Sequence, residues 1–172
     1  MLHRGKVLVC KASDIGGGNF AGNSPEKAAD RFAAALLMPH SILKPKLHKA
    51  PKLDFAFIDQ MAQDFKTSRT AMAIRIIESG TFPALLVCHG HGGRKWFVRP
   101  SNLPDYYFPQ DELDPESFAF DILFGSAAED VRPRKIGADA WFGFRNADRY
   151  EIHEQSVRVM NNDILTLLQF KA

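Results

Sequence analysis

The stretch that most constrains how this chain can fold runs from Ser24 to Pro39, S-P-E-K-A-A-D-R-F-A-A-A-L-L-M-P. Ser24 is a favourable N-cap, and Pro25 suits the first helical position, where a missing N–H has no cost. Pro39 ends the run because proline does not continue a helix. The interior is apolar on nearly every side, as in a helix packed between other elements. The sequence therefore predicts a bounded helix of about four turns.

Polar side chains in this predicted helix are confined to its first two turns, where Glu26 and Asp30 lie four residues apart. That spacing puts both carboxylates on one side of the helix, above Ala33 and Leu37. Two like charges repel there, and the apolar surroundings add a desolvation cost, so a cation is their natural partner. The alternative is that Glu26 faces water near the helix N-terminus while Asp30 pairs with a basic residue elsewhere.

The run E-x-x-x-D-x-F-A-x-x-L-L-M-P, which begins at Glu26, resembles the second conserved helix of the ImmA/IrrE family, zinc-dependent endopeptidases of the gluzincin type. In that family a first helix carries H-E-x-x-H, and the second helix supplies the third zinc ligand. The resemblance implies that Glu26 is that ligand and that Asp30 orients a ligand histidine. It also implies a protein substrate, such as a transcriptional repressor, and a role in regulatory or stress-response proteolysis.

The chain departs from the family at the first helix. None of its six histidines begins an H-E-x-x-H. His153 is followed by Glu154, but position 157 is Val157 and the surrounding pattern is that of a strand. The resemblance implies instead that Met1 to Arg4 are the end of the first family helix, so that the chain starts just after the motif.

A catalytic zinc needs three protein ligands, a water and a general base. The intact family member would bind zinc, whereas we expect this chain to hold none and to be inactive as a peptidase. Two explanations stay open: a fragment of a longer enzyme, or a natural homologue that has lost catalysis. A hypothesis of another class is a non-catalytic regulatory module that binds a ligand or a partner protein.

Composition and charge exclude several classes of protein. With 45% hydrophobic residues, a chain of 172 residues can build a core. A net charge of +2 is too small to indicate a nucleic-acid or membrane partner. Cys10 and Cys88 form neither a metal knuckle nor a disulfide framework, which predicts a reducing cytoplasm. Apolar runs are too short for a membrane span or a signal peptide, so we expect no membrane association.

A loop and two helices are expected after the first helix. Three prolines and four lysines between residues 39 and 52 predict a stiff basic loop. Apolar residues at helical spacing predict a helix over about 55–66. Thr67 and Ser68 begin another helix, which Gly80 ends.

This helical pair has the spacing of a helix-turn-helix from Ala62 to Arg75. Arg69 and Arg75 would then contact DNA. A helical core gives the same pattern without DNA, and the resemblance implies that these helices pack behind the metal site. Because the net charge of the chain is close to zero, DNA binding is the least favoured of these functions.

From residue 82 onward the periodicity is that of strands. An apolar run to His89, the turn G-H-G-G and the run R-K-W-F-V-R predict a β-hairpin. Alternation predicts further strands within 118–124, 136–144, 150–160 and 164–170. About six strands indicate a mostly antiparallel sheet. We therefore expect an α+β fold, with a small helical metallopeptidase-like subdomain at 1–81 and a β-rich region at 82–172.

Several polar residues of the β-rich region are further candidates. Cys88, His89 and His91 cluster at the hairpin tip, where a loop is the simpler interpretation than a metal site. Periodicity places Asp121 and Asp139 on solvated faces. Some ImmA/IrrE proteins carry a β-rich region that binds small molecules, so the resemblance suggests a sensory role by analogy.

Overall fold

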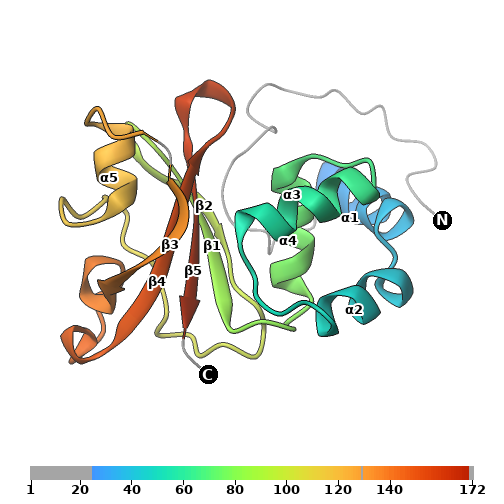
Figure 1. The fold of residues 1–172 in the computed structure, drawn as a ribbon, viewed down its shortest axis with the longest axis horizontal. Helices are drawn as coiled ribbons and strands as arrows, with labels where there is room; N and C mark the ends of the chain where they lie inside the picture. Colours follow the sequence, from blue (N-terminus) through green and yellow to red (C-terminus); the bar gives the residue numbers. More distant parts are fainter. Residues whose placement is uncertain (1–24, 129, 171–172) are drawn as a thin grey trace.

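The computed structural model describes residues 25–128 and 130–170 (Figure 1). Five α-helices and one five-stranded antiparallel sheet make up this part of the chain, which confirms the predicted α+β class. The helices are α1 (Pro25–Leu37), α2 (His40–His48), α3 (Phe55–Asp64), α4 (Arg69–Glu78) and α5 (Phe118–Leu123). The strands are β1 (Ala84–Gly90), β2 (Gly93–Val98), β3 (Asp130–Gly137), β4 (Glu151–Arg158) and β5 (Ile164–Phe170).

The sheet has the strand order β2-β1-β5-β4-β3 and separates two layers (Figure 1). Helices α1 to α4 lie on one side of it and α5 on the other. Alternate residues of each strand point to opposite faces. Leu86 and Leu167 accordingly join the core beneath the helices, whereas Leu85 and Leu168 join a second core beneath α5. No described helix is long and apolar enough to cross a membrane.

The predicted boundary at residue 81 separates the first four helices from the strands, but the hydrophobic core runs across it. Ile58 of α3 and Ile76 of α4 are fully buried in one cluster with Leu86 of β1 and Val157 of β4. Ala84 begins β1 only a few residues after α4 ends, so the chain passes directly from the helices into the sheet. The helices and the sheet therefore stabilise each other through a shared core.

Two glutamines also join the sheet to the helices. Gln155 of β4 accepts a hydrogen bond from the backbone amide of Phe55, at 2.9 Å, in the first turn of α3. Gln169 of β5 donates to the carbonyl of Leu53 at 2.7 Å. Asp54, between these two positions, is the N-cap of α3 and accepts the amide of Phe57 at 2.8 Å. The buried polar groups at the start of α3 thus have hydrogen-bond partners on the sheet and on Asp54 of the helix cap.

Helix α1 matches its predicted bounds, since it ends at Leu37 just before Pro39. Its C-terminal end is fixed by Arg75 of α4, whose Nε donates to the carbonyl of Met38 at 3.2 Å. A cation at this end also suits the helix dipole. The predicted cap Ser24 and the proposed family-helix remnant Met1 to Arg4 lie outside the described residues.

The prediction of a loop between residues 39 and 52 was wrong, because α2 occupies most of it. Pro45 lies inside this helix and removes one backbone hydrogen bond. Leu43 and Leu47, four residues apart, are fully buried against the core. Burial of this apolar pair outweighs the cost of the proline, which is an example of tertiary packing overriding local propensity.

The strand predicted at 118–124 was also wrong: this segment is the helix α5. Ser117 caps it by accepting the amide of Phe120 at 3.2 Å. Ala119, Ile122 and Leu123 are buried, which is the i, i+3, i+4 pattern of one helical face. The alternating aromatic residues concealed this face, because nearly every position in the segment is apolar.

The strand predicted at 136–144 was wrong for most of its length, because β3 begins at Asp130 and shares only residues 136 and 137 with the predicted segment. A 3₁₀ turn at Ala138–Ala140 follows, and Trp141 and Phe142 then pack into the core beneath α5. The described residues therefore form five strands where about six were expected. The strands predicted within 150–160 and 164–170 and the hairpin of β1 and β2 are confirmed.

We expect Gln155→Met to lower the free energy of unfolding by about 1–3 kcal/mol, because it leaves the buried amide of Phe55 without its acceptor. Urea unfolding measures the change. Gln63→Met, at an exposed position of α3, is the matched control and should stay within about 0.5 kcal/mol of the wild type. Equal stability of the two variants would show that the link between β4 and α3 contributes nothing.

Candidate functional site

The predicted zinc-binding positions lie in the first turns of α1. Glu26 is the second residue of the helix, and Asp30 follows one turn later. Their side chains are outside the described part of the structure, so their roles as ligand and orienting carboxylate stay predictions. At 3.6 residues per turn, both helical positions fall on the side of α1 that carries Ala33 and Leu37.

That side of α1 adjoins an uncovered apolar face. Phe32, Leu36 and Leu37 of α1 and Ile42 of α2 have exposed fractions between 53% and 70%. Met38, in contrast, is 2% exposed and packs against the core. Helix α1 therefore uses one side to contact the protein and presents a second apolar side to solvent. Exposed apolar residues clustered in this way are typical of a surface that packs against another element.

The two predicted DNA-contact arginines have partners inside the protein. Arg69 makes two hydrogen bonds to Asp59, with Nε 2.6 Å from Oδ1 and Nη2 2.9 Å from Oδ2. Arg75 donates to the carbonyl of Met38, as described above. The helices α3 and α4 do form the predicted pair joined by a tight turn. These contacts give both arginines a structural role without DNA, and DNA contact stays an untested prediction.

The candidate metal cluster at the hairpin tip is divided between the two faces of the sheet. Cys88 belongs to the core beneath the helices, whereas His89 contacts Trp141 in the other layer. Burial raises the pKa of the Cys88 thiol to about 12. No group of three His, Cys, Asp or Glu side chains within 25–128 and 130–170 is arranged to hold a metal.

His89 is a buried imidazole with one unsatisfied nitrogen. It is 1% exposed, and its ring lies edge-on to Trp141, with ring centroids 5.7 Å apart. Nε2 is 3.4 Å from the carbonyl oxygen of Gln110, whereas Nδ1 is buried without a hydrogen-bond partner. Burial is the main cause that lowers the pKa of His89 to about 4. The ring is therefore neutral at pH 7.

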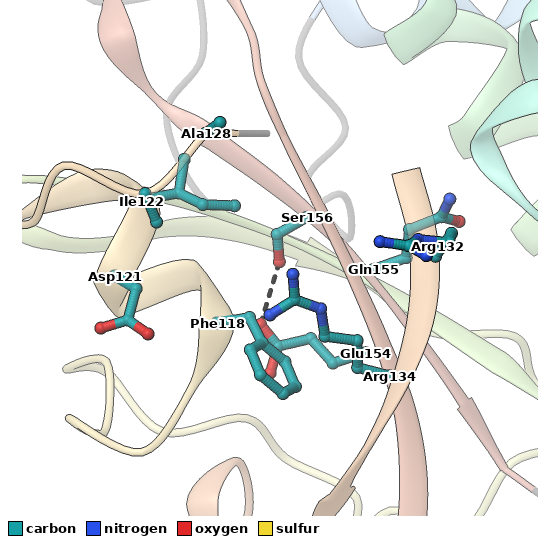
Figure 2. Close-up of a pocket in the computed structure, with 10 residues that line it drawn as sticks. Phe118, Asp121, Ile122, Ala128, Arg132, Arg134, Glu154, Gln155 and Ser156 are labelled. Atoms are coloured by element: carbon teal, nitrogen blue, oxygen red, sulfur yellow. Dashed lines mark hydrogen bonds between the residues drawn. The ribbon is translucent and has the colours of Figure 1, made fainter. Parts of the chain in front are cut away.

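Glu154 of β4 is a buried carboxylate, and Figure 2 shows its hydrogen bond with Ser156. Its Oε1 accepts hydrogen bonds from the amide of Ala119, at 2.7 Å, and from the hydroxyl of Ser156, at 3.0 Å. Its Oε2 accepts the indole N–H of Trp141 at 3.0 Å. Burial raises the pKa of Glu154, and these donors act in the opposite direction. The carboxylate thus caps the N-terminal end of α5.

The other end of α5 is held from the same strand. Arg158 of β4 donates to the carbonyl of Ile122 in the last turn of the helix. A carboxylate at the N-terminus and a guanidinium at the C-terminus both complement the helix dipole. Arg134 of β3 lies over the Phe118 ring, with Cζ 4.5 Å from the ring centroid (Figure 2).

The cavity beside Glu154 is too small for a substrate. Its volume is about 30 Å³, and Phe118, Asp121, Arg134 and Glu154 are among the residues that line it. A single ordered water needs at least about 10–15 Å³, so this space accepts one or two waters. The hydrogen bonds that Glu154 accepts therefore give it a structural role. Asp121 and Asp139 are exposed, as predicted.

The sequence offered a partial signal for Glu154. Ile152, Glu154 and Ser156 occupy alternate positions of β4, so they share the face of the second core. Alternation along β4 is a signal that could have assigned Glu154 to that face, but it does not reveal the partners, which come from residues 119 and 141. The unsatisfied nitrogen of His89 had no sequence signal, because it results from packing.

Comparison with protein-family models and with curated proteins gave no match.

We expect Glu154→Gln to lower the free energy of unfolding by about 1–3 kcal/mol, because an amide NH₂ must then face an N–H or O–H donor. Trp141→Phe removes one such donor. The double variant should therefore lose about 1 kcal/mol less than the sum of the single losses. Urea unfolding of all four proteins checks this, and strictly additive losses would contradict the contact between these side chains.

His89 should make stability depend on pH. Its folded-state pKa is below the unfolded value, so its contribution is full above about pH 6.5 and is lost as the pH falls toward 4. Between about pH 7 and pH 5 the wild type should lose about 2 kcal/mol more than His89→Leu. Urea unfolding at several pH values measures this difference. Parallel stability curves for the two proteins would show that His89 does not titrate as described.

Proposed function

We propose that this chain is the C-terminal portion of an ImmA/IrrE-type zinc metallo-endopeptidase of the cytoplasm. Its substrate is a regulatory protein such as a transcriptional repressor. The 172 residues contain no H-E-x-x-H, so by themselves they lack two zinc ligands and the catalytic base. In this proposal, Glu26 becomes the third ligand when a helix with that motif packs against α1, and Asp30 orients one of its histidines.

The observation that carries the proposal is the uncovered apolar face of α1 and α2. Glu26 and Asp30 occupy helical positions next to this face, on the side of Ala33 and Leu37. A helix that buries Phe32 and Leu36, which lie four residues apart on α1, would also approach the first turns of α1. Buried apolar surface contributes about 25 cal/mol per Å², so covering these side chains would drive the association.

The other side of α1 is well anchored, which favours a ligand role for its first turns. Arg75 holds the C-terminal end of the helix at Met38, and the buried leucines of α2 fix the segment that follows. A metal ligand must be held in position by the elements behind it. Helices α3 and α4 supply that support in this proposal, which is the packing role expected for the helical pair.

A second candidate function is a non-catalytic regulatory module. The same exposed apolar face favours it, because a partner protein could cover the face without forming a metal site. The two candidates differ in one measurable property, which is zinc bound with the participation of Glu26.

Metal analysis separates the two candidates. We expect the chain alone to bind no stoichiometric zinc. When it is joined to the gene segment immediately upstream, or mixed with a peptide that carries H-E-x-x-H in a helix, it should bind about one zinc per chain. Glu26→Gln should then weaken zinc binding by at least about tenfold, and Asp30→Asn by about 10–100-fold.

Glu116→Gln, at an exposed position remote in sequence from α1, is the control and should bind zinc like the wild type. An upstream segment that covers α1 but contains no H-E-x-x-H would favour the regulatory module. If the chain alone bound one zinc per chain, and Glu26→Gln did not weaken that binding, both candidate functions would be contradicted.

A further inference from the structure

Aromatic side chains gather on the surface of the layer that contains α5. Tyr106, Phe108 and Tyr150 have exposed fractions of 53% to 54%, and Phe144 is partly buried beside them. We call these four residues the aromatic ledge. Two of them belong to the loop between β2 and α5, and two to the segment between β3 and β4, so the fold brings them together. A contiguous group of exposed apolar side chains is typical of a binding surface.

The ledge is fixed in place by the rings beneath it. The ring centroid of Tyr107 lies 4.6 Å from that of Tyr106 and 5.4 Å from that of Phe144. Tyr107 in turn packs on Phe170 of β5, with centroids 4.3 Å apart. Tyr107 and Phe144 both pack against the core beneath α5. The exposed rings are therefore held in position before any partner binds, which lowers the entropic cost of binding.

Two adjoining hollows give the ledge its shape, because Tyr106 and Phe144 line both of them. The first hollow has a volume of about 300 Å³ and is also lined by Arg145 and Tyr150. The second has a volume of about 410 Å³, and Phe108 is among the other residues that line it. The centroids of the two shared rings are 5.2 Å apart. A partner that enters both hollows must therefore cross a pair of aromatic rings.

Charge is unevenly distributed between the two hollows. Arg145, at the first hollow, is exposed. In the second hollow, Arg94 and Asp111 lie 3.7 Å apart and largely balance each other. The guanidinium of Arg94 is also covered, since it lies over the ring of Phe108, with Cζ 4.6 Å from the ring centroid. A partner that follows the ledge thus meets a positive charge at one end and little net charge at the other.

A proline-rich segment has the properties that this surface requires. It forms a polyproline II helix before binding, and its backbone carbonyls make no internal hydrogen bonds. Grooves lined by aromatic rings bind such segments through the proline rings. The phenol hydroxyls of Tyr106 and Tyr150, on half-exposed rings, can donate to the free carbonyls.

Single-stranded nucleic acid also stacks on aromatic side chains, but it needs a basic groove that follows its phosphates. Among the described residues that line the two hollows, the charged ones are Arg145, Arg94 and Asp111. One arginine beside a nearly balanced pair supplies too little positive charge for a chain of phosphates. The surface therefore favours a peptide over a nucleic acid.

We propose that the aromatic ledge binds a proline-rich segment of a partner protein in the polyproline II conformation. Proline rings occupy the two hollows on either side of Tyr106 and Phe144, and an acidic residue at one end of the segment pairs with Arg145. The ledge packs on the core beneath α5, whereas the proposed zinc site lies on α1. The proposal therefore goes beyond the proposed function and does not depend on it.

Two peptides test the proposal, each a run of seven prolines, one with a glutamate at both ends and the other with a lysine at both ends. Amide signals of Gly143 and Arg145 in ¹H–¹⁵N NMR spectra of the full chain report on the two hollows. We expect the glutamate peptide to shift these signals with a dissociation constant on the order of 0.1 mM. The lysine peptide should bind at least about threefold more weakly, in keeping with the value of an exposed ion pair. Arg145→Glu should reverse this preference.

Tyr150→Ala should weaken binding of the glutamate peptide by at least about fivefold, because it removes a wall of the first hollow. Phe124→Ala, which removes an aromatic ring of similar exposure outside the ledge, is the matched control and should bind the peptide like the wild type. The NMR spectrum of each variant shows whether it is folded, and the two peptides test the wild type without any substitution.

The proposal fails if the glutamate peptide does not shift the two signals, if the lysine peptide binds equally well, or if folded Tyr150→Ala binds like the wild type. A thymidine oligonucleotide that shifts these signals at lower concentration than either peptide would assign the ledge to nucleic acid and overturn the proposal. Shifts that depend on protein concentration alone, with none from the peptides, would assign the ledge to a second copy of this chain and also overturn it.

Discussion

A buried carboxylate on the central sheet organises the layer of the protein that contains α5. Glu154 is 1% exposed and accepts hydrogen bonds from Ala119, Trp141 and Ser156. A carboxylate without these donors would be costly to bury. The donors in turn have defined positions because one acceptor binds them all. Six residues form too short a helix to be stable alone, so α5 exists because β4 holds both of its ends.

The sheet is shared by two layers, and this has consequences for function. One face carries the core beneath α1 to α4, where the resemblance to a peptidase is concentrated. The opposite face carries Glu154, α5 and the core on which the aromatic ledge packs. Neighbouring residues of β1 serve the two layers, since Cys88 faces the helices and His89 the other side. The strand β1 therefore contributes side chains to both layers.

The two proposals rest on different physical features and do not depend on each other. The peptidase proposal rests on apolar surface that α1 leaves uncovered beside the positions of Glu26 and Asp30. The peptide-binding proposal rests on exposed aromatic rings that line two adjoining hollows. Both surfaces expose apolar groups to water, which is unfavourable in the isolated chain.

The sequence by itself determined the elements whose pattern is local and strong. These are α1 with its proline boundaries, the helical pair α3 and α4, the β1–β2 hairpin and the last two strands, and hence the α+β class. Only the tertiary structure decided α2, α5, the position of β3 and the 3₁₀ turn after it, because burial of Leu43, Ile122 and Trp141 outweighs local propensity there. Likewise, residue spacing alone could not predict that Glu154 contacts Trp141 or that Nδ1 of His89 lacks a hydrogen-bond partner. Those contacts join segments that meet only when both faces of the sheet are covered.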